Sequence, residues 1–496
     1  MMTLNEDLLS EIFCRLSEKD LVTCMSVSRS WHQMSSDVWV RRFWAQSPVL
    51  GLYFNTVGLS PPPSPPPSPC PYYPSYWCGM RFISLYNYTY DEDNQVRTKN
   101  HRGYRDFLKY KIMMQRCRHF SRLDDDTDNY LDGCNGLLLL LKSGGSTTYH
   151  QFYVCNPITR QQVAILKAGV HNRHEHFCAA LAFDPLESPH NYRVVRIDYS
   201  ESVSSSSASA WTTVQVDIFW SKYAQWVRHK VQLDPEFTEG FRTFKLCRHF
   251  VYLHGKLYSI AMSWKLLWID LNTTVIKAGS LKLPTIPEEA DEATSLSYNS
   301  LGVSMDLLCY MKRDRSNTIR IWSYNDRCES GEWILKYSIP RSGLEWRRRI
   351  FLEYEKDNED SVWFEPYAIS PNSDVLFFGT SKSISSYHLK RTEVEFVCEI
   401  LESDIDAETA AGYYFPAFAL RACFIPFCQM HKTNNSGSTP ISMGSEGTEI
   451  LSAEVPCDEQ EDGGVEVINV RLCCRYQKEP LPMLYPSEIP LEFRSA

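Results

Sequence analysis

The sequence predicts a multidomain α plus all-β protein, in which a small three-helix module precedes a β-propeller-like domain of about six or seven blades. Two observations predict this fold. Apolar residues recur at helical spacing in the first 46 residues, and short β-type runs separated by turn residues fill residues 103–428. We therefore divide the chain into a helical module at 1–46, a linker at 47–102, the β domain at 103–428 and an acidic flexible segment at 429–496.

The first predicted helix has one apolar face, formed by Leu8, Leu9, Ile12, Phe13 and Leu16. Asn5 is a favourable N-cap, and acidic residues in the first turn complement the helix dipole. A second helix is indicated by Leu21, Cys24, Val27, Ser28 and Trp31, and a third covers Asp37 to Trp44. Helices this short bury a core only with difficulty, so part of the apolar surface is expected to face a partner. The alternative is that the module packs on the rest of the chain.

The order of these residues resembles the F-box, the adaptor-binding module of SCF-type cullin-RING ubiquitin ligases. The pattern runs Leu-x3-Leu-Leu-x2-Ile-Phe-x2-Leu, then Asp-Leu, then Cys-x2-Val-Ser-x2-Trp. Asn5 and Ser17 stand where F-boxes usually carry Pro, and both residue types can cap a helix instead. The resemblance implies binding to a Skp-family adaptor, and through it to cullin and RING subunits, by Leu4, Leu8, Leu9, Ile12, Phe13, Leu16, Leu21, Val27 and Trp31.

Residues 60–76 form a proline-rich tract within the linker. Proline donates no backbone hydrogen bond and favours an extended polyproline II conformation, which predicts a stiff linker. Docking to an aromatic groove, or phosphorylation at Ser60, Ser64 or Ser68, is the alternative reading of the same tract.

The β domain contains an internal repeat, in which an aromatic residue near the middle of a strand is followed by a polar turn and another strand. It recurs at Tyr153, Phe219, Trp268, Trp322 and Tyr387. Blade-like repeats of roughly 40 to 50 residues are typical of propellers, which gives the expectation of six or seven blades. A pair of β-sandwiches is the competing architecture.

Several segments of this domain resemble landmarks of the plant F-box-associated domain, which is often kelch-like. They are residues 132–137, 153–161, 181–185, 301–303 and 366–370. In that family the C-terminal domain is taken to recruit the protein that is ubiquitylated. The resemblance therefore implies a substrate receptor.

The C-terminal segment is acidic, with no Lys or Arg between Lys432 and Arg471. This composition predicts a flexible tail. The alternation from Val465 to Tyr476 predicts one further strand, and the proline-rich end is expected to run along the surface.

Composition excludes several classes of function. A net charge of -9 argues against nucleic acid as a partner, because phosphate binding needs a concentrated basic face. No run reaches the 18 apolar residues of a membrane span, and no secretory signal begins the chain. The 17 cysteines are therefore expected to be reduced thiols in a cytoplasmic or nuclear protein.

No catalytic motif, cofactor or metal is expected. The only short-spaced set of metal-ligating residue types is His171, His174, His176 and Cys178, and an exposed loop is the simpler interpretation. We expect the blade loops to form a protein-binding face, with aromatic anchors at Trp211, Tyr223, Trp264 and Trp346. The sequence thus predicts a non-catalytic substrate receptor of an SCF-type ubiquitin ligase. The alternatives are an interaction scaffold without a ligase role and a carbohydrate-directed propeller.

Overall fold

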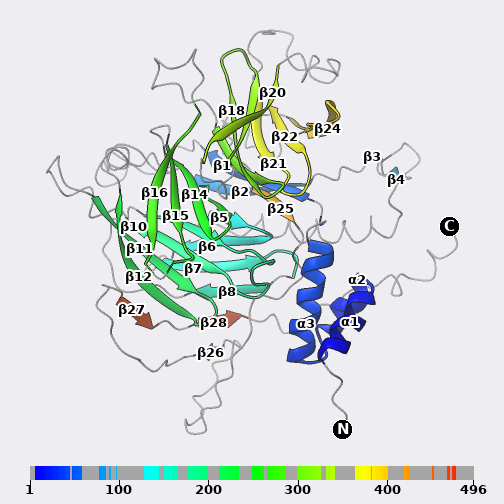
Figure 1. The fold of residues 1–496 in the computed structure, drawn as a ribbon, viewed down its shortest axis with the longest axis vertical. Helices are drawn as coiled ribbons and strands as arrows, with labels where there is room; N and C mark the ends of the chain where they lie inside the picture. The colour runs from blue at the N-terminus through cyan, green and yellow to red at the C-terminus, as the bar shows by residue number, and fades with distance from the viewer. Residues whose placement is uncertain are drawn as a thin grey trace, which may run out of the picture.

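The computed structural model describes the three-helix module, most strands of the β domain and three short C-terminal strands (Figure 1). The described residues are 6–44, 47, 49–58, 77–84, 89–90, 96–97, 128–143, 150–159, 161–165, 177–198, 212–233, 249–261, 265–273, 275–284, 299–324, 331–340, 364–380, 383–399, 418–421, 423, 449–451, 466–469 and 472–475. The proline-rich tract, the Asn5 cap and most of the acidic tail lie outside them.

The helical module consists of α1 (Glu6–Arg15), α2 (Glu18–Cys24), α3 (Arg29–Trp39) and a π-helical turn, η1 (Val40–Trp44). Its second and third helices differ from the prediction. Ser28 is extended (φ -159°, ψ 166°) and its hydroxyl accepts a bond from Trp31 N at 3.2 Å, so a new helix begins there instead of α2 continuing to Trp31. The predicted third helix is the end of α3 and its continuation into η1. Ser17 caps α2, as predicted, by accepting from Asp20 N at 3.3 Å.

The β domain is a propeller, as predicted, and its described residues form five antiparallel blades of four consecutive strands each. The first holds β5 (Asp128–Cys134), β6 (Leu137–Ser143), β7 (His150–Asn156) and β8 (Gln161–Ile165). The second holds β9 (Phe177–Ala182), β10 (Arg193–Asp198), β11 (Thr212–Trp220) and β12 (Gln225–Leu233). The third holds β13 (Val251–Leu253), β14 (Lys256–Ala261), β15 (Lys265–Asp270) and β16 (Lys277–Lys282).

The last two blades follow the same plan. The fourth holds β17 (Asn299–Ser304), β18 (Leu307–Arg313), β19 (Ile319–Tyr324) and β20 (Trp333–Ile339). The fifth holds β21 (Glu365–Ile369), β22 (Val375–Thr380), β23 (Ser383–His388) and β24 (Glu393–Glu399). In each blade successive strands pair as neighbours, so chain order equals strand order. Every blade can therefore form from local hairpins.

The predicted number of six or seven blades is wrong, although the aromatic repeat identified each blade. Its five residues lie on the third strand of the five blades, namely β7, β11, β15, β19 and β23. The error came from dividing the length of the domain by a repeat of about 40 to 50 residues. Successive blades are separated in the sequence by segments such as 234–248 and 341–363, which make the domain longer than five repeats of that length.

A three-stranded sheet joins the two ends of the propeller. It is formed by β2 (Trp77–Ser84), β1 (Val49–Gly58) and β25 (Phe418–Arg421), in that order. β25 contacts both β5 and β21, so this sheet lies between the first and fifth blades. β1 and β2 belong to the stretch interpreted as a linker. Pairing a strand from before the blades with one from after them ties the ring closed, since opening it would expose both.

The remaining strands are short. β3 (Thr89–Tyr90) pairs with β4 (Val96–Arg97), and β26 (Glu449–Leu451) extends the first blade through β28 (Leu472–Arg475). β27 (Glu466–Asn469) extends the second blade. The single strand predicted over Val465 to Tyr476 is therefore two strands in different sheets.

Two glycines near the turn between β5 and β6 have separate structural reasons. Asn135 (φ 47°) and Gly136 (φ 93°) form a two-residue hairpin turn that requires positive φ at both positions. A Cβ on Gly133 would lie 2.6 Å from the Phe418 ring, so glycine is needed where β25 meets β5. None of the helices in the described part of the chain is long and apolar enough to cross a bilayer.

Candidate protein-binding surfaces

The helical module is held together by a core and by a bond to the end of α1. Phe13 and Leu21 are buried, and the Phe13 ring meets Trp31 edge to face at a centroid distance of 5.2 Å. Arg42 Nη1 donates to the carbonyl oxygen of Leu16 at 2.8 Å, which satisfies an acceptor at the C-terminal end of α1. The module is therefore a packed unit despite its size.

The structure divides the predicted adaptor-binding residues into two groups. The inward group comprises buried and half-buried side chains that pack within the protein: Leu9, Phe13, Leu16, Leu21 and Trp31. The outward group comprises Leu8, Ile12 and Val27, which are 51%, 46% and 60% exposed. Leu4 lies outside the described residues. The inward group shapes the module, and only the outward group is available to a partner.

Leu8 and Ile12 are one helical turn apart on α1, so their side chains are neighbours on the same face. Exposing large aliphatic side chains to water costs free energy that burial in an interface would recover. Because the rest of this helix face is packed inward, this exposed pair is the feature of the module that most directly indicates a protein partner.

The module is also attached to the propeller through the residues that follow α3. The Arg421 guanidinium lies 4.0 Å from the centroid of the Trp44 ring, and its Nη2 donates to the carbonyl oxygen of Trp44. Asn372 Nδ2, in the turn between β21 and β22, donates to the carbonyl oxygen of Ser47 at 2.7 Å. The alternative prediction, that the module packs on the rest of the chain, therefore also holds, while Leu8 and Ile12 stay exposed.

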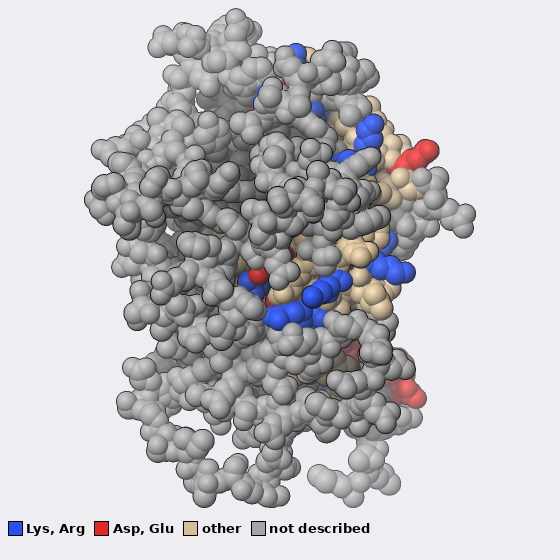
Figure 2. Space-filling view, turned by 90° about the vertical axis from the view of Figure 1, so that its left-hand side faces the viewer, with Lys and Arg blue, Asp and Glu red and all other residues tan. Residues whose placement is uncertain are grey.

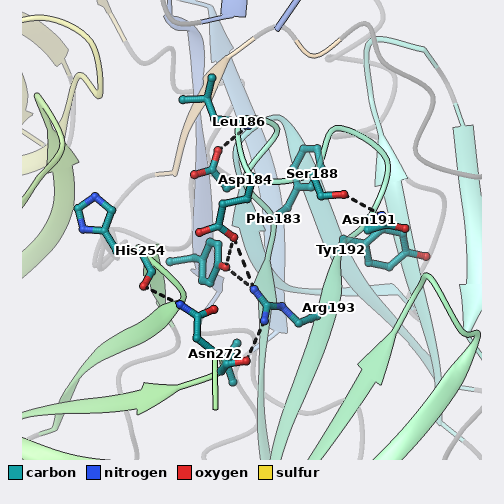
Figure 3. A network of polar contacts seen from close by, with 12 residues as sticks. Phe183, Asp184, Leu186, Ser188, Asn191, Tyr192, Arg193, His254 and Asn272 are labelled. Carbon is teal, nitrogen blue, oxygen red and sulfur yellow. Dashed lines mark hydrogen bonds and ion pairs between the residues drawn. The ribbon is translucent and has the colours of Figure 1, made fainter. Parts of the chain in front are cut away.

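A polar network connects the second and third blades (Figure 3). Arg193 Nη1 donates to the carbonyl oxygen of Leu271 at 2.9 Å, and its guanidinium also bonds the Tyr252 hydroxyl. Tyr252 in turn donates to Glu187 Oε2 at 2.7 Å, and Glu187 lies 3.7 Å from Arg193. Burial raises the pKa of the Tyr252 hydroxyl above its usual range, so it remains a donor at neutral pH.

The segment Phe183 to Tyr192, which carries part of the family-like pattern, forms the turn that supplies this network. Asp184 Oδ1 accepts from Leu186 N at 2.8 Å, and burial raises the pKa of the Asp184 carboxyl. Asn191 Nδ2 donates to Ser188 Oγ at 2.7 Å. These bonds hold the turn between β9 and β10, which carries Glu187. The family-like pattern at 181–185 therefore lies beside the contact between the second and third blades.

A surface groove of ≈ 360 Å³ lies beside the network and is lined by Trp220, Tyr223, Arg193 and Tyr252, among others. Tyr223, one of the four predicted aromatic anchors, is 53% exposed there. Trp211, Trp264 and Trp346 lie outside the described residues. The Arg193 charge is matched by Glu187, and Lys222 and Asp184 also line the groove, so it offers charged as well as aromatic contacts.

The candidate metal cluster is not tested, because three of its residues, His171, His174 and His176, lie outside the described residues. Cys178 is on β9, and burial raises the pKa of its thiol, so it remains protonated at neutral pH. Within the described ranges no three His, Cys, Asp or Glu side chains converge on a metal position.

The chain thus combines a helical module that displays apolar side chains with a propeller of local hairpins, an arrangement typical of modular interaction proteins. Comparison with protein families gives its place. Residues 1–43 match the F-box domain, and residues 103–401 match the F-box associated beta propeller domain. The chain belongs to the family of F-box proteins with an F-box-associated β-propeller domain.

The similarity to an individual F-box protein is lower and covers only part of the chain. The chain is 28% identical over 223 residues to F-box protein At5g07610 of Arabidopsis thaliana, an alignment that covers 44% of this chain and 50% of that protein. The chain thus spans about half the length of this curated relative.

Two solved structures are similar at 10% and 11% identity. The propeller domain of Myceliophteria thermophila Cps50 (Swd1) has a TM-score of 0.30, covering 54% of this chain and 72% of that chain. The Pseudomonas aeruginosa periplasmic gluconolactonase PpgL has a TM-score of 0.27, covering 70% and 96%. These scores support no conclusion about what this chain does.

Proposed function

We propose that the protein is a non-catalytic substrate receptor of an SCF-type cullin-RING ubiquitin ligase, acting in the cytoplasm or nucleus. The F-box would bind a Skp-family adaptor, and the propeller would hold a target protein near the charged ubiquitin-conjugating enzyme. In this arrangement the rate gain comes from proximity, which raises the effective concentration of the target, and requires no acid–base group of this chain.

The observation that carries the proposal is the exposed pair Leu8 and Ile12 on α1, within the F-box match. Adaptor binding would bury this pair, which gives a reason for two large aliphatic side chains to face water. The attachment of Trp44 to Arg421 supports the second part of the proposal, because it holds the F-box at a defined position on the propeller.

The experiment is co-purification of the full chain with a Skp-family adaptor, comparing wild type with Leu8→Asp/Ile12→Asp. We expect a stable complex with wild type and its loss in the double variant, because each Asp would place an unpaired carboxylate in an apolar contact. Val275→Asp is the matched control, since Val275 is 68% exposed on the third blade and should leave binding unchanged.

Thermal unfolding of each variant separates lost contact from lost fold. Both Leu8 and Ile12 are exposed, so the double variant should unfold close to wild type. If the folded double variant bound the adaptor as well as wild type, the assignment of this face would be wrong. If wild type formed no complex, an interaction scaffold without a ligase role would replace the proposal.

A further inference from the structure

The outermost strands of the five blades differ in whether a further strand pairs with them. A strand at the edge of a sheet presents unpaired backbone N–H and C=O groups, which can pair with another strand. In the first two blades these positions are taken, because β28 pairs with β8 and β27 pairs with β12, both antiparallel. In the third, fourth and fifth blades the outer strands β16, β20 and β24 have no further strand paired with them among the described residues.

Two of these three open edges carry the usual protection against pairing. β16 has exposed lysines at both ends, Lys277 and Lys282, and β24 has exposed Glu393 and Glu395. The view onto the side of the molecule where β10 to β12 and β16 lie shows Lys and Arg side chains prominent among the described surface residues (Figure 2). Charged side chains on an edge strand disfavour pairing with another chain.

β20 of the fourth blade is different. Ile334 and Leu335 are 55% and 46% exposed and are adjacent in the chain. The strand is nonetheless firmly held at both ends: Trp333 Nε1 donates to the carbonyl oxygen of Lys282 at 3.1 Å, and Ile339 is buried. The exposed apolar pair is therefore on an ordered, extended backbone.

A β-bulge interrupts the pairing of β20 with β19. Trp322 pairs with Leu335 and Ile321 pairs with Tyr337, so Lys336 is the extra residue, and it is exposed. The bulge breaks the regular ladder after Leu335, so a flat pairing edge remains over Trp333 to Leu335, between the exposed Glu332 and the exposed Lys336. This combination suits a short extended segment better than a long strand or a helix.

We propose that β20 is a docking edge for a short extended segment of a partner protein, which adds to the fourth blade as a fifth, antiparallel strand. Main-chain hydrogen bonds would supply affinity, and alternate side chains would supply specificity. The segment would place apolar side chains on Ile334 and Leu335 and a carboxylate near Lys336. The fifth strands on β8 and β12 show that blade edges of this protein accept such an addition. The proposal rests on the proposed function in one respect, that the partner is the target protein.

The experiment begins with a displayed library of random 12-residue peptides, selected against the full chain. We expect enriched peptides with two neighbouring apolar residues, one for each face of the strand, and an acidic residue. Their affinity should fall at least about tenfold for Ile334→Lys/Leu335→Lys, because each side chain contributes apolar burial, and should be unchanged for Val275→Lys. Both altered residues are exposed, so thermal unfolding should match wild type.

A second measurement uses only wild-type protein and tests the pairing itself. N-methylation of every other backbone nitrogen of an enriched peptide should abolish binding in one register and spare it in the other, because alternate N–H groups face the blade. Equal loss, or no loss, in both registers would overturn strand addition. So would peptides that bind the double variant as well as wild type, or a library that yields no binder.

Two further results separate this inference from other readings. A concentration-dependent dimer that Ile334→Lys/Leu335→Lys abolishes would overturn it and assign the edge to a second copy of the chain. Adaptor binding should be intact in this variant, and peptide binding intact in Leu8→Asp/Ile12→Asp. Failure of one proposal therefore leaves the other standing.

Discussion

Replacing Arg421 by Ala should loosen the attachment between the F-box module and the propeller. The guanidinium is buried, lies over Trp44 at 4.0 Å and donates to the Trp44 carbonyl. Burial lowers its pKa to about 10, so it still carries its charge at neutral pH. A desolvated cation–π contact contributes about 2 kcal/mol and a hydrogen bond from a charged donor about 1.5–3 kcal/mol. Because Ala also removes the cost of burying the cation, we expect a net loss of about 2–4 kcal/mol.

Urea unfolding followed by tryptophan fluorescence measures this loss, and a double-mutant cycle with Trp44→Leu isolates the pair. The coupling energy should be about 1–2 kcal/mol, because removing either partner already breaks the cation–π contact. Arg421→Lys should fall between Ala and wild type, since it keeps the charge and loses the planar stack. A coupling energy close to zero would show that the stacked geometry does not join the two parts.

The remaining predictions concern the F-box core and His249, which lies just before the third blade. Phe13→Ala should destabilise the protein by about 3–5 kcal/mol, because it leaves a cavity in the core of the module. Adaptor binding should fall only in proportion to the unfolded fraction, which thermal denaturation and adaptor titration of the same variant measure. Loss of binding in a folded variant would contradict this prediction. Burial lowers the pKa of His249 to about 4, so the unfolded chain binds the extra proton first as the pH falls. The free energy of unfolding should therefore fall as the pH is lowered from about 6.5 to 4. Urea unfolding at pH 7, 5.5 and 4.5 should show a smaller fall for His249→Gln than for wild type. An equal fall in both proteins would contradict this prediction.

Some of the predicted adaptor residues are buried and others are exposed, and helical periodicity does not distinguish the two groups. Leu8, Leu9, Ile12 and Phe13 share one broad apolar face, and spacing alone assigns all four to it. Which of them turns inward depends on Trp31 and Leu21, which come from other helices. Because Phe13 packs on Trp31, Phe13→Asp would act first by disrupting the core of the module and not at the adaptor contact that the resemblance implies.

The propeller shows a similar limit. Hairpin partners are close in the chain, so turn residues and alternation located β11 with β12 and β15 with β16, and the aromatic repeat located every blade. The innermost strands of the fourth and fifth blades, β17 and β21, were seen only through the family resemblance. β1 and β25 were missed, because their partner lies hundreds of residues away and leaves no local signal.

The sequence by itself determined the class of protein, the F-box pattern, the cap at Ser17 and the five-fold aromatic repeat, because the residues that carry each of these lie close together in the chain. Tertiary structure alone decided the closure of the ring by β1 and β25, the attachment of Trp44 to Arg421 and the exposure of Leu8, Ile12 and Ile334. These depend on which surfaces meet once the blades are assembled, and burial is a property of the whole fold.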